Sequence, residues 1–232
     1  MFKSIYLGIR IYFHSFNGFF QFFWITININ QLQNNRRKKL KIKTLVFLLI
    51  FIFSCSSSSF NFSEVTIKGG SLPEYNRNIE DAAVGAYAPI PTGVDLNSEP
   101  ITVTTRIGLE EKKASIIVFL AHWCSHCQRE VPMIQKFINS NGYPNNLNLF
   151  GVATHIDKNR NNYPPDSWLQ REQFNIPTIF DDENNSIADS FGLSAFPFWV
   201  FLNPDGTVYM RHAGSLSEDQ FFQVMTAGNI LE

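Results

Sequence analysis

The hydrophobic pattern beyond residue 80 alternates between strand-like and helix-like segments. Residues 115–121 are apolar almost throughout, which predicts a central strand buried on both faces. Residues 128–141 place apolar side chains three and four apart, which predicts a helix that Gly142 ends. The further predicted elements are a hairpin of strands at 88–91 and 101–103, strands at 147–154, 176–180, 198–202 and 207–212, helices at 166–174 and 187–191, and a last helix opened by a capping box at 217–220. This order predicts an α/β fold, a central mixed β-sheet flanked by helices, with an N-terminal β-hairpin extension.

A different pattern precedes this domain, which we place at residues 81–232. Residues 40–54 combine a short basic region with an apolar stretch of ten residues, too short to span a bilayer as a helix, and predict a signal peptide. Residues 55–80 are polar and predict a flexible linker. Residues 1–39 show no capping or turn signals. We expect them to be a non-native upstream extension or a membrane-associated leader.

Charge is distributed unevenly along the chain. Residues 1–54 hold eight of the 19 Lys and Arg residues and none of the 20 Asp and Glu residues. The remainder is therefore acidic, whereas nucleic-acid binding requires a basic face. A basic, apolar leader before an acidic domain instead favours export.

Two of the three cysteines stand three residues apart, directly after the predicted central strand. Cys124 and Cys127 at the start of a helix can form a strained, easily reversed disulfide, which makes a thiol–disulfide exchange centre. We expect Cys124 at the helix N-terminus to be the nucleophile and Cys127, one turn further, to resolve the mixed disulfide. His126 either stabilises the Cys124 thiolate or is an exposed histidine with little effect.

Other functions of a paired cysteine fit the chain less well. A structural zinc site needs four ligands, and the domain has no further cysteine. A thiol peroxidase needs a threonine or serine three residues before its cysteine, where this chain has Ala121. A binding module without redox activity would be expected to lose one of the two cysteines.

Residues 119–132 resemble the active-site strand and helix of the thioredoxin superfamily, and most of all its TlpA-like envelope reductases. Pro132 matches the proline that kinks this helix. Residues 195–198 match the cis-proline loop, in which Phe196 and Pro197 would bind the partner backbone. Residues 203–208 match the hairpin that follows, and the whole resemblance covers residues 82–228.

The resemblance implies a protein disulfide reductase with no cofactor beyond the Cys124–Cys127 disulfide, with Trp123 and Ser125 completing the site. It implies exported proteins as partners, a membrane thiol carrier as electron donor, a role in cytochrome c maturation, and a monomer. Residues 52–55 resemble the lipobox of bacterial lipoproteins, which implies a lipid on Cys55 and a place on the outer face of the cytoplasmic membrane.

Two features bear on the direction of electron flow, and a third bears on the choice of partner. Val118 stands where thioredoxin has a buried acid, so Glu130, His122 or water would have to accept the proton of the resolving thiol. We otherwise expect Arg129 and Glu130 to make solvated surface contacts. The Ser125-His126 dipeptide and the missing acid favour an oxidase or isomerase, whereas the resemblance as a whole favours a reductase. Bulky Phe196 leaves the partner preference open.

Overall fold

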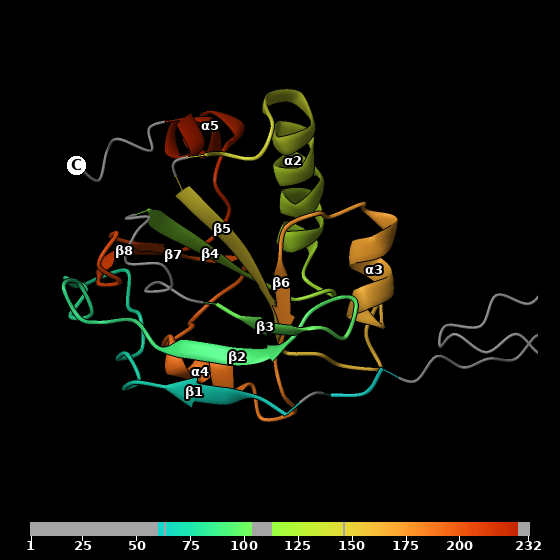
Figure 1. Cartoon of the computed structure of the whole chain (residues 1–232), viewed down its shortest axis with the longest axis horizontal. Helices are drawn as coiled ribbons and strands as arrows, with labels where there is room; N and C mark the ends of the chain where they lie inside the picture. Colours follow the sequence, from blue (N-terminus) through green and yellow to red (C-terminus); the bar gives the residue numbers. More distant parts are fainter. Residues whose placement is uncertain (1–59, 63, 104–112, 146, 227–232) are drawn as a thin grey trace, which may run out of the picture. The chain divides into compact units, whose positions relative to one another are not determined.

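The computed structural model describes residues 60–62, 64–103, 113–145 and 147–226. Its main sheet has five strands in the order β6-β5-β4-β7-β8 (Figure 1). These strands are β4 (Ala114–Leu120), β5 (Leu147–Ala153), β6 (Thr178–Phe180), β7 (Phe198–Leu202) and β8 (Val208–Ala213). β4, β5 and β6 are parallel, whereas β7 and β8 run antiparallel to their neighbours, so the sheet is mixed as predicted.

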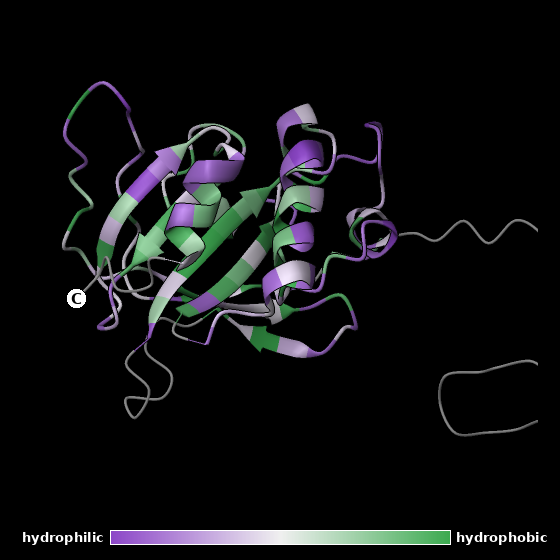
Figure 2. Cartoon of the chain, turned by 90° about the horizontal axis from the view of Figure 1, so that it is seen from above, coloured by the Kyte–Doolittle hydropathy of each residue, from purple (hydrophilic) through white to green (hydrophobic). Residues whose placement is uncertain are grey.

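Strand β4 lies at the centre of this sheet and is buried along its whole length. Because successive side chains point to opposite faces, Ile117 and Phe119 pack on one side and Val118 and Leu120 on the other. Figure 2 shows that the central strands are hydrophobic over most of their length. Burying one such side chain stabilises the fold by about 1.5–3 kcal/mol, so the two apolar layers hold β4 rigidly.

In the described part of the chain, four helices cover the sheet. They are α2 (Ser125–Asn141), α3 (Pro165–Arg171), α4 (Ser186–Ser190) and α5 (Glu218–Thr226). Side chains of α2, α3 and α5 join the core cluster of Val118, whereas those of α4 join the cluster on the opposite face. Gly142, with φ of 80°, ends α2 as predicted. Ser217 and Gln220 exchange side chain–backbone hydrogen bonds of 2.9 and 3.1 Å, which confirms the capping box. None of the helices in the described ranges is long and apolar enough to cross a membrane.

A second, three-stranded sheet precedes the central one. It contains β1 (Thr66–Lys68), β2 (Ile90–Val94) and β3 (Pro100–Thr102) in that order. Antiparallel pairing of β2 with β3 confirms the predicted hairpin. β1, however, lies inside residues 55–80, where we expected a flexible linker, and it pairs with β2.

Folded structure therefore begins before residue 81. The backbone N–H of Leu72 donates to Ser190 O at 2.8 Å, and that of Tyr75 donates to Gly192 O at 2.9 Å. Leu72 is buried. The hydrophobic pattern missed this segment because its few apolar residues are separated by polar ones, and only contacts with distant residues hold it.

A buried ion pair ties the same segment to β8. Arg211, 1% exposed, pairs with Asp81 through two hydrogen bonds, and its Nη1 donates to Pro73 O and Phe191 O at 2.8 Å each. The hydrogen bond from Arg211 lowers the pKa of Asp81. Removing one partner of such a pair leaves a buried charge uncompensated, so residues 73–81 are held firmly to the domain.

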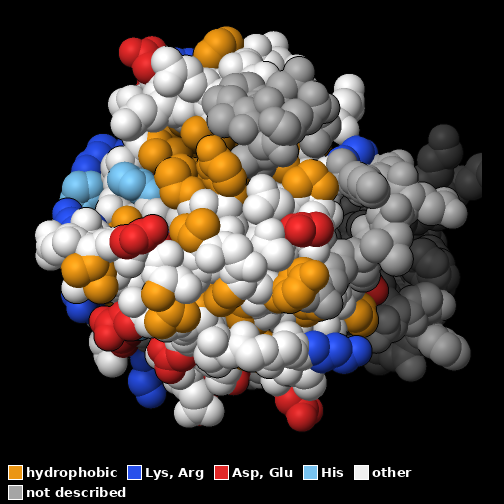
Figure 3. Space-filling view, turned by 90° about the vertical axis from the view of Figure 1, so that its left-hand side faces the viewer, with side chains coloured by type: hydrophobic (Ala, Val, Ile, Leu, Met, Phe, Trp, Pro, Cys, Tyr) orange, Lys and Arg blue, Asp and Glu red, His pale blue; other side chains and the backbone are white. Residues whose placement is uncertain are grey.

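Several large apolar side chains are exposed on or near β8. They are Val84, Tyr87, Tyr209 and Met210. Figure 3 shows hydrophobic side chains on the side of the molecule that β8 and the N-terminal loops form.

Candidate redox site

The central strand delivers the two cysteines to the start of α2. β4 ends at Leu120, and Cys124 is the N-cap residue of α2, with φ of −77° and ψ of 121°. The Cys124 N–H donates to Ala121 O, and the Cys124 carbonyl accepts from Gln128 N–H, both at 3.0 Å. Cys124 is 9% exposed and Cys127 not at all, and both are free thiols. Both cysteines are thus largely covered, and only Cys124 keeps a small exposed fraction.

Burial controls the chemistry of Cys127. It raises the pKa of this thiol far above its ordinary value, and the neighbouring Cys124 and Glu130 add to the effect. The Ala121 N–H, 3.5 Å from the sulfur, opposes it. Because a thiol must lose its proton to act as a nucleophile, Cys127 needs a base close by.

Glu130 is buried, so our expectation of a solvated surface contact was wrong for this residue. It is 3% exposed, and its Oε1 accepts a hydrogen bond of 2.8 Å from Leu216 N–H. Burial raises the pKa of the Glu130 carboxyl, against the opposing effects of Leu216, Trp199 and Arg129. The sequence did contain a signal, because Glu130 follows Cys127 by three residues and so shares its helix face.

Trp199 lies at the same place on the sheet. It pairs with Val118 in the β4–β7 register, and both side chains are fully buried. Its indole Nε1 lies close enough to Glu130 to lower the pKa of that carboxyl, but the geometry falls short of a hydrogen bond, and in the described part of the chain no other buried side-chain nitrogen or oxygen lacks a partner. Val118 and Trp199 therefore fill the place where an acid was expected, and Glu130 supplies a carboxyl from α2.

The predicted cis-proline loop lies beside the cysteines. The Phe196–Pro197 bond is cis, and Pro197 O accepts a hydrogen bond of 2.9 Å from Gly214 N–H. The Phe196 ring makes edge contacts with Trp123 and His155, at centroid distances of 5.7 and 5.1 Å. We call these three side chains the aromatic cluster. It gives the site an apolar rim next to Cys124.

His126 and Ser125 are exposed at the first turn of α2. The His126 Nδ1 lies 2.9 Å from Nη2 of Arg129 and 3.2 Å from the Ser215 hydroxyl. Because a guanidinium only donates hydrogen bonds, Nδ1 is the acceptor in this contact. This arrangement favours the interpretation in which His126 has little effect on the thiolate.

His122 is buried, and both of its ring nitrogens are engaged. Nδ1 lies 2.6 Å from Asn161 O and must donate to it, whereas Nε2 accepts from Asp157 N–H at 3.1 Å. Burial lowers the pKa of His122, which favours this neutral form. Of the two side chains considered as acceptors of the Cys127 proton, His122 is thus occupied elsewhere and Glu130 remains.

The predicted lipid-attachment residue, Cys55, and the predicted signal peptide lie outside the described residues. No group of three or more His, Cys, Asp or Glu side chains suited to a metal ion occurs in the ranges that the structure describes.

Comparisons with known proteins agree with this geometry. Residues 83–231 match the family model described as Redoxin. A structure from Chlorobium tepidum, described as a thiol:disulfide interchange protein DsbE, is 15% identical with a TM-score of 0.50, over 62% of this chain and 96% of that chain. At this identity the likeness establishes the fold alone.

Two further solved structures are similar. The thioredoxin domain of a thiol-disulfide oxidoreductase from Bacteroides vulgatus is 18% identical, over 66% of this chain and 100% of that one, with a TM-score of 0.49. StoA from Bacillus subtilis is also 18% identical, over 60% of this chain and 96% of that one, with a TM-score of 0.47.

The raised pKa of Glu130 predicts a pH-dependent effect of Glu130→Gln. The folded protein holds this proton to a higher pH than the unfolded chain, in which the carboxyl ionises near 4.5. Between the two pKa values the folded state binds more protons, so this group lowers stability as pH rises. The variant keeps an acceptor for Leu216 N–H and should gain stability relative to the natural protein from pH 4 to pH 8. Urea denaturation at the two pH values measures the gain.

The exposed Glu183 provides the control for this experiment. Glu183→Gln should show no gain between the two pH values. An equal stability difference at both pH values for Glu130→Gln would show that its carboxyl does not titrate abnormally.

Proposed function

Because the chain belongs to the Redoxin family of thioredoxin-fold thiol–disulfide oxidoreductases, we propose that it reduces disulfides of exported proteins through Cys124 and Cys127. The observation that carries this proposal is the asymmetry of the pair. Cys124, at the N-cap of α2, keeps an exposed fraction of 9%, and Cys127 is fully buried beside a carboxyl of raised pKa. Such a pair can accept a partner on one sulfur and release it with the other.

In the first step the Cys124 thiolate attacks one sulfur of the partner disulfide. A bond forms between Cys124 Sγ and that sulfur, and the partner's own S–S bond breaks. The second partner sulfur leaves as a thiolate and takes up a proton from solvent. Cys124 is the attacking residue because Cys127 has no access to solvent.

In the second step Cys127 resolves the mixed disulfide. Its thiol proton passes to the Glu130 carboxylate, and the resulting thiolate attacks Cys124 Sγ. The partner leaves as a thiolate, and the Cys124–Cys127 disulfide forms. Two electrons have then moved from the cysteine pair to the partner. A raised pKa suits Glu130 to this task, because a general base works best when its pKa lies near the working pH.

Two findings support the reducing direction over an oxidase or isomerase. The absence of an acid at Val118 favoured an oxidase, but Glu130 places a carboxyl in the same buried region. His126 also favoured an oxidase, but its Nδ1 faces the guanidinium of Arg129. We propose that a thiol carrier in the membrane restores the dithiol by the same exchange in reverse.

We also propose that the protein acts as a monomer, anchored to the outer face of the cytoplasmic membrane by a lipid on Cys55. The support is the pattern at residues 40–55, a basic region, an apolar stretch, and a small residue before cysteine. Mass spectrometry of the intact native protein should show a chain that begins at a lipid-bearing Cys55. A peptide from residues 1–39, recovered from cells, would contradict this start.

Single cysteine variants test the order of the two steps. Cys124→Ser should abolish the reduction of a protein disulfide, because the accessible nucleophile is lost. Cys127→Ser should still attack but should accumulate mixed disulfides, visible as adducts on non-reducing gels. Full activity of the Cys124 variant would rule out the mechanism.

The reduction potential of the Cys124–Cys127 couple tests the direction. We expect a value near −270 mV, as for thioredoxin, which makes the dithiol a reductant. Equilibration of the natural protein with glutathione buffers measures it. A value near −120 mV would favour the oxidase alternative.

A further inference from the structure

The loop between β5 and α3 is part of the redox site. The two residues before Cys124 hold it in place, since Trp123 Nε1 donates to His155 O at 2.7 Å and the ring of His122 bonds both Asn161 O and Asp157 N–H. The backbone carbonyl of His122 also accepts a bond of 3.3 Å from the Asn162 side chain. Residues 155–162 therefore have a fixed position beside the cysteines.

This loop places a cation against the aromatic cluster. Cζ of Arg160 lies 4.6 Å from the centroid of the Trp123 ring, within the range of a cation–π contact. Asp157 lies 3.6 Å from Arg160 Nε, but the Arg160 side chain remains 57% exposed. Its guanidinium is thus oriented on one side by Trp123 and still accessible to a partner.

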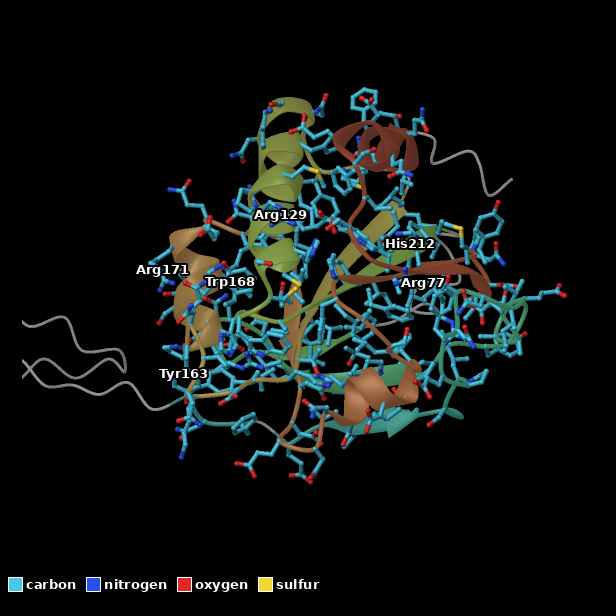
Figure 4. All side chains as sticks on the ribbon, turned by 180° about the vertical axis from the view of Figure 1, so that it is seen from behind. Arg77, Arg129, Tyr163, Trp168, Arg171 and His212 are labelled. Carbon is cyan, nitrogen blue, oxygen red and sulfur yellow. The ribbon has the colours of Figure 1, made fainter. Side chains whose placement is uncertain are left out.

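A second guanidinium contacts the residues that follow Cys124. Arg129 extends from α2, and its Nη2 contacts His126, two residues after Cys124. Figure 4 shows Arg129 on α2, with Arg171 on α3 to one side and His212 on β8 to the other. We call Arg129 and Arg160 the arginine pair. Arg160 contacts the residue before Cys124, and Arg129 contacts a residue just after it.

The guanidiniums of the arginine pair are more open to solvent than the acids that contact them. Arg129 is exposed, whereas Glu130, which interacts with it, is 3% exposed and accepts a hydrogen bond from Leu216 N–H. The Arg160 side chain is 57% exposed, and that of Asp157, its ion-pair partner, is 42% exposed. An approaching partner therefore meets guanidinium N–H donors beside the cysteines, in a chain with slightly more acidic than basic residues.

We infer that the arginine pair selects partner proteins with Asp or Glu residues on both sides of the reactive disulfide. This inference rests on the proposed function, because it concerns the partner that reacts with Cys124. A guanidinium presents a fork of N–H donors that matches a carboxylate. The partner is a protein segment rather than a small thiol. The aromatic cluster and the cis-proline loop lie next to the redox site and would offer such a segment apolar and backbone contacts.

Three peptides that share one disulfide test the inference. They differ only in the residues that flank the peptide's own cysteines, which are Glu, Gln or Lys. The reduced natural protein should reduce the Glu peptide about tenfold faster than the Gln peptide at low salt, and the Lys peptide slowest. The difference should shrink at high salt, because exposed charges are screened. Arg129→Gln and Arg160→Gln should each lower the Glu-to-Gln rate ratio about threefold, and the double variant about tenfold.

Two further variants separate charge from structure. Lys136→Gln removes an exposed charge from α2 next to Glu218 and should leave the ratio unchanged. Arg129→Lys keeps the charge and should restore most of the ratio. Equal losses with all three peptides would indicate a structural role and would overturn the inference, as would a Glu-to-Gln ratio near one in the natural protein.

Other outcomes separate this inference from the proposed function. Failure to reduce even the Gln peptide would count against the proposed function. In that case, the affinity of the protein for a Glu peptide whose disulfide is replaced by a thioether would still test the role of the arginine pair. An equal affinity for the matching Gln peptide would overturn the inference. A third outcome is that the protein reduces oxidised glutathione in a way that depends on both arginines but shows no preference among the peptides. This result would also overturn the inference and would identify a small anionic thiol as the partner.

Discussion

The complete burial of Cys127 is the constraint on which the redox site depends. A thiol without access to water holds its proton strongly, so it reacts only when a base lies within reach and an electrophilic sulfur lies next to it. Both conditions follow from the start of α2 directly after β4, which puts Cys124 at the N-cap and Glu130 one turn beyond Cys127. Because β4 is packed on both faces, this geometry is rigid.

The buried carboxyl of the redox site comes from helix α2 rather than from the central strand β4. Val118 of β4 faces the region where an acid was expected, and Trp199 pairs with it across the sheet. Glu130 instead enters the same core from α2 and is held by the Leu216 backbone. A buried carboxyl is costly unless it is hydrogen-bonded, and the Leu216 N–H meets that condition while burial still raises the pKa of Glu130.

The residues before Cys124 link the chemistry to the surrounding surface. His122 and Trp123 precede the reactive cysteine, and they also hold the loop that carries Arg160. The sulfur, the apolar rim and the charge beside it therefore belong to one connected unit. A change in His122 would alter the position of Arg160 as well as the approach to Cys124.

The sequence by itself determined the fold class, the hairpin and the cysteine pair, because these depend on local patterns, and the cis-proline loop was expected from the resemblance to the thioredoxin superfamily. The run at 115–121, the spacing of Cys124 and Cys127, and the capping box at 217–220 each use neighbouring residues alone. Only the tertiary structure decided that residues 66–75 pack on the domain, that Glu130 is buried, and that the 155–162 loop belongs to the site. Those outcomes depend on contacts between residues far apart in the chain. The spacing of Cys127 and Glu130 puts both on one helix face, but nothing along the sequence shows that Leu216 would meet that face.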